Sequence, residues 1–238
     1  MHKLVIDGLA VDVVRKPIRN LHLGVYPPHG RVRVAAPQSM DDEAVRLAVI
    51  SKHAWIKRQQ SHFKSQVRQS AREFIYRESH YHFGHRYLLN IIEQDGPANV
   101  VIQNKTVLDL YVPKGSDIQK REKVMNEWYR SELKQCIPRL IRKWESVLGV
   151  EVGFFGIKKM KTKWGSCNSR ASRIWINLEL AKKPVKCLEY IVVHEMVHLL
   201  IRHHDDNFRD MLDRVMPLWQ LYRDELNRAP LGHATWKY

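Results

Sequence analysis

The sequence predicts an α+β protein, and three observations point to that class. Residues 4–36 and 87–112 alternate apolar and polar side chains, as half-buried strands do. Residues 124–148 instead place apolar side chains at helical spacing. Two further helices are expected to begin near Pro184 and Asp205, because proline and aspartate are common at helix starts. Strands and helices are therefore both expected along the chain.

The first block is expected to form an antiparallel unit of strands over residues 4–36, with a turn at Pro27-Pro28-His29-Gly30. Ser39 or Asp41 then caps a helix, since both side chains accept hydrogen bonds from free helical N–H groups. We expect this helix to continue through its apolar positions Val45, Ala48, Val49, Trp55 and Ile56.

The middle and last parts of the chain alternate between strands and helices. Strand-like runs are expected at residues 87–92, 99–102, 107–112, 152–157 and 173–180. Asp95-Gly96 predicts a hairpin between the first two of them. The helix over 124–148 is expected to stop at Gly149, because glycine readily adopts the left-handed conformation of a helix C-terminus.

Composition excludes several classes of protein. The chain has 238 residues with 40 Lys and Arg against 25 Asp and Glu, a formal charge of +15, and it is 44% hydrophobic. Such a composition excludes a disordered chain, a collagen and a disulfide-rich mini-scaffold. The longest apolar stretches are far shorter than the roughly 18 residues that a membrane span needs.

The amino terminus does not resemble a secretory signal, because Asp7 and Asp12 interrupt any apolar core there. The odd number of cysteines and their wide spacing favour free thiols over a disulfide framework. We therefore expect a cytoplasmic protein that does not contact a membrane and carries free thiols at Cys136, Cys167 and Cys187.

The segment His194-Glu195-Met196-Val197-His198 is an HExxH element in the middle of a predicted helix. Residues four apart lie one turn apart on one helix face, so both imidazoles can reach one metal ion while Glu195 lies beside it. The flanking residues are strongly apolar, and polar side chains buried among them are costly unless a metal ion compensates. A metal site is therefore favoured over a buried histidine pair that binds no metal.

A catalytic zinc site needs a third protein ligand and one open position. His203 and His204 are the candidates. On a continuous helix His204 would lie about 15 Å along the axis from His194 at the usual rise per residue, so the helix must end and the chain must fold back. Asp205 and Asp206 are good caps for a following helix, and His204 is favoured because it directly precedes them.

These residues predict a zinc-dependent metallopeptidase that hydrolyses peptide bonds through a zinc-bound water activated by Glu195. His194, His198 and His204 are the expected Zn²⁺ ligands, and the expected substrate is a polypeptide. Asp205, Asp206 or Glu189 is expected to orient the ligand rings, a choice that the sequence leaves open.

The chain resembles the YgjP-like metallopeptidases, which are minimal zincins similar to the WLM and SprT-like proteases. The likeness rests on Lys161-Thr162-Lys163-Trp164-Gly165-Ser166-Cys167, on the HExxH element with the preceding Val192-Val193, and on the later His204, Phe208 and Pro217-Leu218-Trp219. Two positions differ. The family usually has a Ser-Pro-like pair where this chain has Asp205-Asp206, and an arginine where it has Lys163.

The resemblance implies a zincin-like catalytic domain over residues 113–238 with an N-terminal strand-helix portion over 1–112 packed on it. It implies the same zinc ligands and the same catalytic glutamate as the spacing does. It also implies that the strand of residues 173–180 pairs with extended substrate. Trp164-Gly165-Ser166-Cys167 is interpreted as a turn that packs Trp164 and leads into that strand, since a nucleophile there would need a paired base.

Two runs of the sequence are basic and contain no acidic residue, which favours a surface that attracts DNA or another polyanion. The residues expected to form that surface are Lys52, Lys57, Arg58, Lys64, Arg68, Arg72, Lys158, Lys159, Lys161 and Lys163. Two functional alternatives follow: a protease acting on DNA-associated proteins, and a nucleic-acid-binding protein with a vestigial or structural zinc site. His80, His82 and His85 form a weaker candidate for a second metal site.

Overall fold

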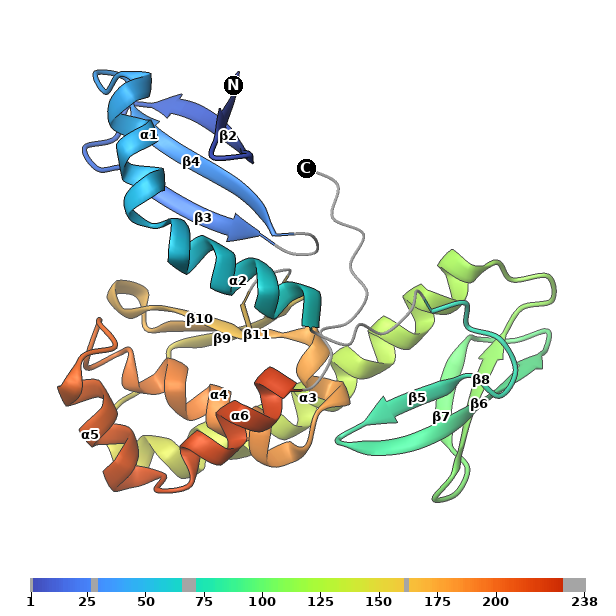
Figure 1. Cartoon of the computed structure of the whole chain (residues 1–238). Coiled ribbons are helices and arrows are strands. Elements are labelled where there is room, and N and C mark those ends of the chain that lie inside the picture. Colours follow the sequence, from blue (N-terminus) through green and yellow to red (C-terminus); the bar gives the residue numbers. More distant parts are fainter. Residues whose placement is uncertain (1, 27–29, 66–71, 161–162, 229–238) are drawn as a thin grey trace. The chain divides into compact units, whose positions relative to one another are not determined.

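The computed structural model in Figure 1 describes residues 2–26, 30–65, 72–160 and 163–228, and the side chains of 62–65 and 228 are not described. Within these residues it contains three β-sheets and six α-helices, which confirms the α+β class. The chain divides into two compact units, the first spanning Met1–Arg68 and the second beginning at Gln69. The predicted portions 1–112 and 113–238 stay a prediction.

The first unit is a four-stranded sheet covered by helices. Its strands are β1 (His2–Ile6), β2 (Leu9–Lys16), β3 (His22–Tyr26) and β4 (Arg31–Pro37), in the order β1-β2-β4-β3. The expected purely antiparallel pairing is wrong at one place, because β2 and β4 are parallel. Alternation predicts which face of a strand is buried, and it does not predict the neighbouring strand.

Two helices follow the first sheet, α1 (Asp42–Ser51) and α2 (His53–Ser65). Asp41 caps α1 as expected, since its carboxylate accepts from the Ala44 N–H at 2.8 Å. The predicted continuous helix is wrong, because α1 ends at Ser51 with Lys52 as its C-cap, and α2 begins at His53. The core of this unit is aliphatic, and its fully buried side chains include Val11, Val13, Val34, Val45, Val49 and Ile56.

The second unit opens with a four-stranded sheet. Its strands are β5 (Ser79–His82), β6 (His85–Glu93), β7 (Asn99–Ile102) and β8 (Val107–Val112), in the order β5-β6-β8-β7. The three predicted strands are confirmed. The hairpin at Asp95-Gly96 is wrong, because β6 and β7 flank β8 on opposite sides instead of pairing with each other.

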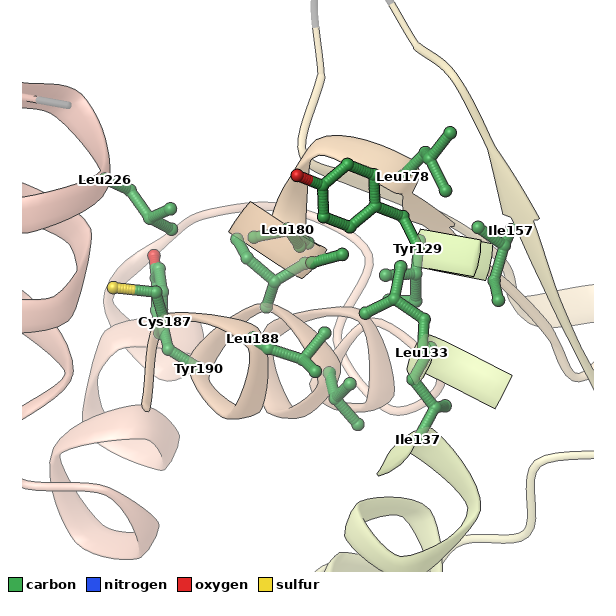
Figure 2. Close-up of a cluster of buried hydrophobic side chains, with 14 of the residues drawn as sticks. Tyr129, Leu133, Ile137, Ile157, Leu178, Leu180, Cys187, Leu188, Tyr190 and Leu226 are labelled. Carbon is green, nitrogen blue, oxygen red and sulfur yellow. The ribbon is translucent and has the colours of Figure 1, made fainter. Parts of the chain in front are cut away.

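The long helix α3 (Ile118–Leu148) joins this sheet to the rest of the second unit (Figure 1). Asp117 caps its start by accepting from the Lys120 N–H at 2.7 Å, and Gly149 ends it in the left-handed conformation with φ 66°, as predicted. Figure 2 shows Tyr129, Leu133 and Ile137 on one face of α3, directed toward the side chains of Leu180 and Leu188. All five side chains are buried, so this face holds the unit together.

The remaining elements carry the candidate site. Strands β9 (Phe154–Lys158), β10 (Gly165–Asn168) and β11 (Arg173–Asn177) form a sheet in the order β10-β11-β9, with short 3₁₀ helices at Ser169–Ala171 and Leu178–Lys182. Helices α4 (Val185–Val197), α5 (Asp206–Val215) and α6 (Trp219–Arg228) complete the unit. The helix starts predicted near Pro184 and Asp205 are confirmed.

Two composition-based expectations can be compared with the structure. Within the residues it describes, no helix is both long enough and apolar enough to cross a membrane. The three cysteines Cys136, Cys167 and Cys187 are unpaired, as predicted.

Candidate metal centre

The HExxH element lies at the carboxyl end of α4. The expectation of a mid-helix position is wrong, because α4 ends at Val197 and His198 is its C-cap. Tight bonds from the Leu199 N–H to the Met196 carbonyl and from the Leu200 N–H to the Val197 carbonyl, both 3.0 Å, turn the chain away from the helix axis. This early end allows the following segment to fold back toward the helix.

The segment returns at His204, directly before the cap of α5. Asp205 accepts from the Phe208 N–H at 3.1 Å and so begins that helix. His204 Nε2 lies 3.0 Å from His198 Nε2 and 3.0 Å from His194 Nε2. His203 is exposed and does not join this group.

Phe208 packs against the imidazole rings of all three histidines. It is buried, and its ring centroid lies 4.9 Å from His194, 4.7 Å from His198 and 4.8 Å from His204. One aromatic side chain on α5 therefore contacts every imidazole of the cluster. The fold-back and the start of α5 fix the three rings together, which is why residues ten positions apart meet.

The three nitrogens fit a metal ion. Nitrogens bound at 2.0–2.1 Å to one tetrahedral ion lie roughly 3.3 Å apart, close to the 3.0 Å that separates His204 Nε2 from each of the other two Nε2 atoms. Among the residues that the structure describes, these histidines are the one group of three or more His, Cys, Asp or Glu side chains whose ligand atoms converge. Three imidazoles and no carboxylate are a donor set that suits zinc and its neighbouring transition metals.

A carboxylate was expected to orient the ligand rings by a hydrogen bond to the ring nitrogen that does not face the metal, and the hydrogen bonds of these nitrogens only partly meet that expectation. His198 Nδ1 donates to the Ile201 carbonyl at 3.0 Å, which leaves the lone pair of Nε2 free for a metal. His194 Nδ1 is buried and has no partner among the described residues. The carboxylates expected to orient the rings act elsewhere, since Asp205 caps α5, Asp206 pairs with Arg209 and Glu189 accepts from Lys143 and Trp144.

Burial dominates the electrostatics of the site. It raises the pKa of Glu195 to about 8, and the positive charge of Lys163 acts in the opposite direction. Burial also lowers the pKa of His194 to about 3, and His198 and His204 add to the effect. The neutral imidazole, which is the form that ligates metals, therefore prevails at His194.

Strand β10 lies directly against the catalytic candidate Glu195. A Cβ atom built on Gly165 would lie 2.5 Å from Glu195 Oε1 and 2.7 Å from its Cγ, closer than Cβ atoms in proteins ever come. Only glycine therefore fits at this position. The Trp164-Gly165-Ser166-Cys167 segment forms the start of a strand and not merely a turn, and its glycine brings the backbone to the carboxylate.

Strand order corrects the expected substrate strand. The run over 173–180 is split, because β11 ends at Asn177 and a 3₁₀ helix follows. β11 is paired on both sides, antiparallel to β10 and parallel to β9, so it has no free edge. β10 and β9 are the edge strands of this sheet, and β10 packs against α4.

A cavity of about 810 Å³ opens along β10 and over two of the three histidines, His198 and His204. Its lining consists of residues 163–170 together with Ile191, Glu195, His198, Arg202 and His204. Cys167 is the only thiol in this lining, and burial raises its pKa to about 11. A protonated thiol is a poor nucleophile, which agrees with the expectation that this segment supplies none.

Asn177, at the end of β11, holds the loop before β10. Its side-chain amide donates to the Met160 carbonyl at 2.9 Å and to the Lys163 carbonyl at 2.7 Å, and its Oδ1 accepts from the Glu179 N–H at 3.2 Å. The residue is buried. Sequence reasoning missed Asn177 as well as Gly165 and Phe208. The glycine of the Trp164-Gly165-Ser166-Cys167 segment, which was interpreted as a turn, was the one local signal that could have found any of the three.

Replacing Asn177 with Ala is expected to lower the free energy of unfolding by about 1–3 kcal/mol, because buried backbone groups lose their partners. Urea unfolding of the variant measures this change. Asn168→Ala is the matched control, since Asn168 is exposed and its Oδ1 accepts one bond of 3.3 Å from the Ala171 N–H. Equal stability of the two variants would contradict the role of Asn177 in stabilising the loop before β10.

The second histidine cluster does not converge on a metal site. His80 Nε2 lies 2.8 Å from Glu78 Oε2, and His82 Nε2 lies 3.2 Å from Glu132 Oε2. Each buried imidazole thus faces its own carboxylate, and His85 joins neither pair. The interpretation of these histidines as ordinary structural side chains is favoured.

In the folded chain, some residues of the two basic runs lie close to acidic side chains. Lys159 pairs with Glu122 at 2.7 Å, Arg72 lies 3.9 Å from Glu78, and Lys158 lies 3.6 Å above the Trp175 ring. Exposed cations of the first run are Lys52, Lys57 and Arg58. The side chains of three further predicted members, Lys64, Arg68 and Lys161, lie outside the described residues.

The mixed α+β fold fits the zincin-like class, and its three converging histidines could hold one metal ion. The sequence profile of the YgjP-like metallopeptidase domain matches residues 20–229. The chain therefore belongs to the YgjP-like metallopeptidases, a family of metal-dependent peptidases acting on polypeptides.

Two other comparisons were made. The crystal structure of the metallopeptidase zymogen of Pyrococcus abyssi abylysin matches with a TM-score of 0.36 and 18% sequence identity, over 38% of this chain and 90% of that chain. The comparison with curated proteins gives no match.

Proposed function

We propose that this protein is a zinc metallopeptidase in which His194, His198 and His204 hold the metal ion and Glu195 is the catalytic base. The observation that carries the proposal is the meeting of three Nε2 atoms beside a cavity that also contains the Glu195 carboxylate. Zinc is the ion favoured by three imidazole ligands in a site open on one side.

Zinc bound there lowers the pKa of a water molecule and polarises the carbonyl of the scissile bond. The protein's own residues supply the remaining steps. Glu195 is 5% exposed and belongs to the cavity lining, so its carboxylate can take a proton from the attacking water and pass it to the leaving amine.

The free edge of β10 is the proposed binding site for the substrate backbone. An extended peptide added to this edge would pass Gly165 and therefore Glu195. Main-chain hydrogen bonds do not depend on side-chain identity, so an unfolded segment of many sequences can pair there.

The proposal is tested by metal analysis of the purified protein and by its activity on an unfolded protein. We expect about one zinc ion per chain and hydrolysis that a chelator stops. His204→Ala should lose both the metal and the activity. His203→Ala should retain both, since the neighbouring ring lies outside the cluster. A protein that holds no metal, or that loses it equally in both variants, would contradict the site.

A second candidate function is association with DNA, which would direct the peptidase to DNA-associated proteins or replace peptidase activity altogether. It is favoured by the charge of +15 and by the exposed Lys52, Lys57 and Arg58. DNA added to the proteolysis assay separates the cases. Stimulation supports a protease of DNA-bound proteins, and salt-dependent binding without any hydrolysis supports a nucleic-acid-binding protein.

A further inference from the structure

Three cations surround the cavity of the candidate metal centre. Lys163, Arg170 and Arg202 belong to its lining and are exposed. Glu195 is the single acidic side chain in that lining. The cavity is therefore more positive than the chain as a whole, in which 40 basic residues face 25 acidic ones.

Arg170 and Arg202 have no ion-pair partner within the part of the chain that the structure describes. Neither guanidinium forms an ion pair or a hydrogen bond with another described residue, whereas Arg209 pairs with Asp206 at 2.9 Å. Asp205, close to Arg202 in sequence, accepts from a backbone N–H. Lys163 acts on Glu195 electrostatically, and its side chain forms no closer pair with a described residue.

The three cations lie at different points along β10. Lys163 precedes the strand, next to the end where Gly165 contacts Glu195, and Arg170 follows the strand at its other end. The strand from Gly165 to Asn168 covers three residue steps, roughly 10 Å at the usual rise of a strand. Arg202 belongs to the returning segment beside His204.

Such an arrangement selects anions. Three cations that outnumber one buried carboxylate in a cavity lining raise the local concentration of negatively charged ligands. Arginine also presents a planar fork of donors that matches the oxygens of a carboxylate or a phosphate. Three polar side chains of the lining lie between Lys163 and Arg170 in sequence: Ser166, Asn168 and Ser169.

We propose that this cavity is an anion-binding subsite that makes acidic polypeptides the preferred substrate class. Carboxylates of the substrate bind to Lys163 and Arg202 close to the cleaved bond and to Arg170 about three residues away from it. The inference rests on the proposed peptidase function for its substrate class. The anion subsite itself rests only on the cavity and its three cations.

Binding tests the subsite without relying on hydrolysis. A labelled ten-residue peptide with Glu at its centre and three residues away is compared with the matching Gln peptide, both on zinc-loaded Glu195→Gln protein. We expect the Glu peptide to bind roughly tenfold tighter at low salt, with the difference shrinking as salt is added. Fluorescence anisotropy measures both affinities.

Arg170→Gln and Arg202→Gln identify the cations responsible. Each is expected to reduce the Glu-to-Gln affinity ratio up to about fivefold, the contribution of one solvent-facing ion pair, and the double variant should leave only the part of the ratio that Lys163 supplies. Arg142→Gln is the matched control, because Arg142 is exposed on α3 and lies outside the cavity lining. An equal effect of Arg142→Gln, or a ratio of one in the unsubstituted cavity, would overturn the proposal.

Hydrolysis by the zinc-loaded protein with Glu195 in place separates the subsite from the peptidase function. Faster cleavage of the Glu peptide supports both. If neither peptide is cleaved but the Glu peptide binds through Arg170 and Arg202, the peptidase function fails and the subsite stands. Inorganic pyrophosphate is the last probe: if it binds through the same arginines while the two peptides bind equally, the anion is a phosphate and the acidic-peptide assignment is overturned.

Discussion

Glu195→Gln is expected to abolish peptide hydrolysis while leaving the metal content of the protein unchanged. The amide has nearly the shape of the carboxylate, so it fits the same space against Gly165. It cannot accept a proton, however, and general acid–base catalysis typically contributes about 10²–10⁴ to the rate. The three histidine nitrogens are not altered by the change.

The measurements are kcat/KM on an unfolded protein substrate and zinc content per chain. Glu189→Gln is the matched control, because Glu189 lies on the same helix and accepts from Trp144 and Lys143 away from the cavity lining. It should keep the metal and the catalytic rate. Full activity of Glu195→Gln with its zinc bound would refute Glu195 as the base.

Gly165→Ala is expected to reduce kcat/KM about 10²-fold, the scale on which a shift of about 1 Å disturbs a catalytic geometry. The new Cβ would lie 2.5–2.9 Å from Oε1, Cγ and Cδ of Glu195, and the buried side chain has little room to give way. Either the carboxylate or the edge strand must move. The expected loss is in kcat, because Gly165 acts through Glu195.

A positioning effect is distinguished from a general loss of structure by two further measurements. The zinc content of Gly165→Ala should equal that of the unsubstituted protein. Its urea midpoint of unfolding should change no more than the midpoint of Gly153→Ala does. Gly153 is the matched control, since a Cβ there meets Ser172 at 3.6 Å, an ordinary contact distance. Loss of zinc in Gly165→Ala, or unchanged kcat, would show that Gly165 does not position the carboxylate.

Much of the local structure was predictable because it depends on short-range patterns. The helix ends lie where the sequence predicts them, with side-chain caps at Asp41 and Asp205 and a left-handed glycine at Gly149. The HExxH spacing places two imidazoles one turn apart. The early end of α4 was missed. The apolar residues after His198 continue the helical pattern, and the turn depends on the packing of the returning segment.

Strand neighbours were the main failure of prediction. The parallel pairs β2–β4 and β6–β8 join strands that are not consecutive, so no turn between them reveals the pairing. The same limit hid the edge position of β10. The family resemblance assigned the substrate role to residues 173–180, whereas only the order of the sheet shows which strands have an unpaired side.

The sequence by itself determined the chemistry of this protein: the HExxH element, a histidine before a helix cap, and the excess of positive charge. These depend on residue types at short spacings, which local geometry translates directly into a donor set. Only the tertiary structure decided what surrounds that donor set. Gly165 against Glu195, Phe208 under the three rings, and Arg170 and Arg202 around one cavity come from elements far apart in sequence, and their contacts exist only once the sheet order and the fold-back are formed.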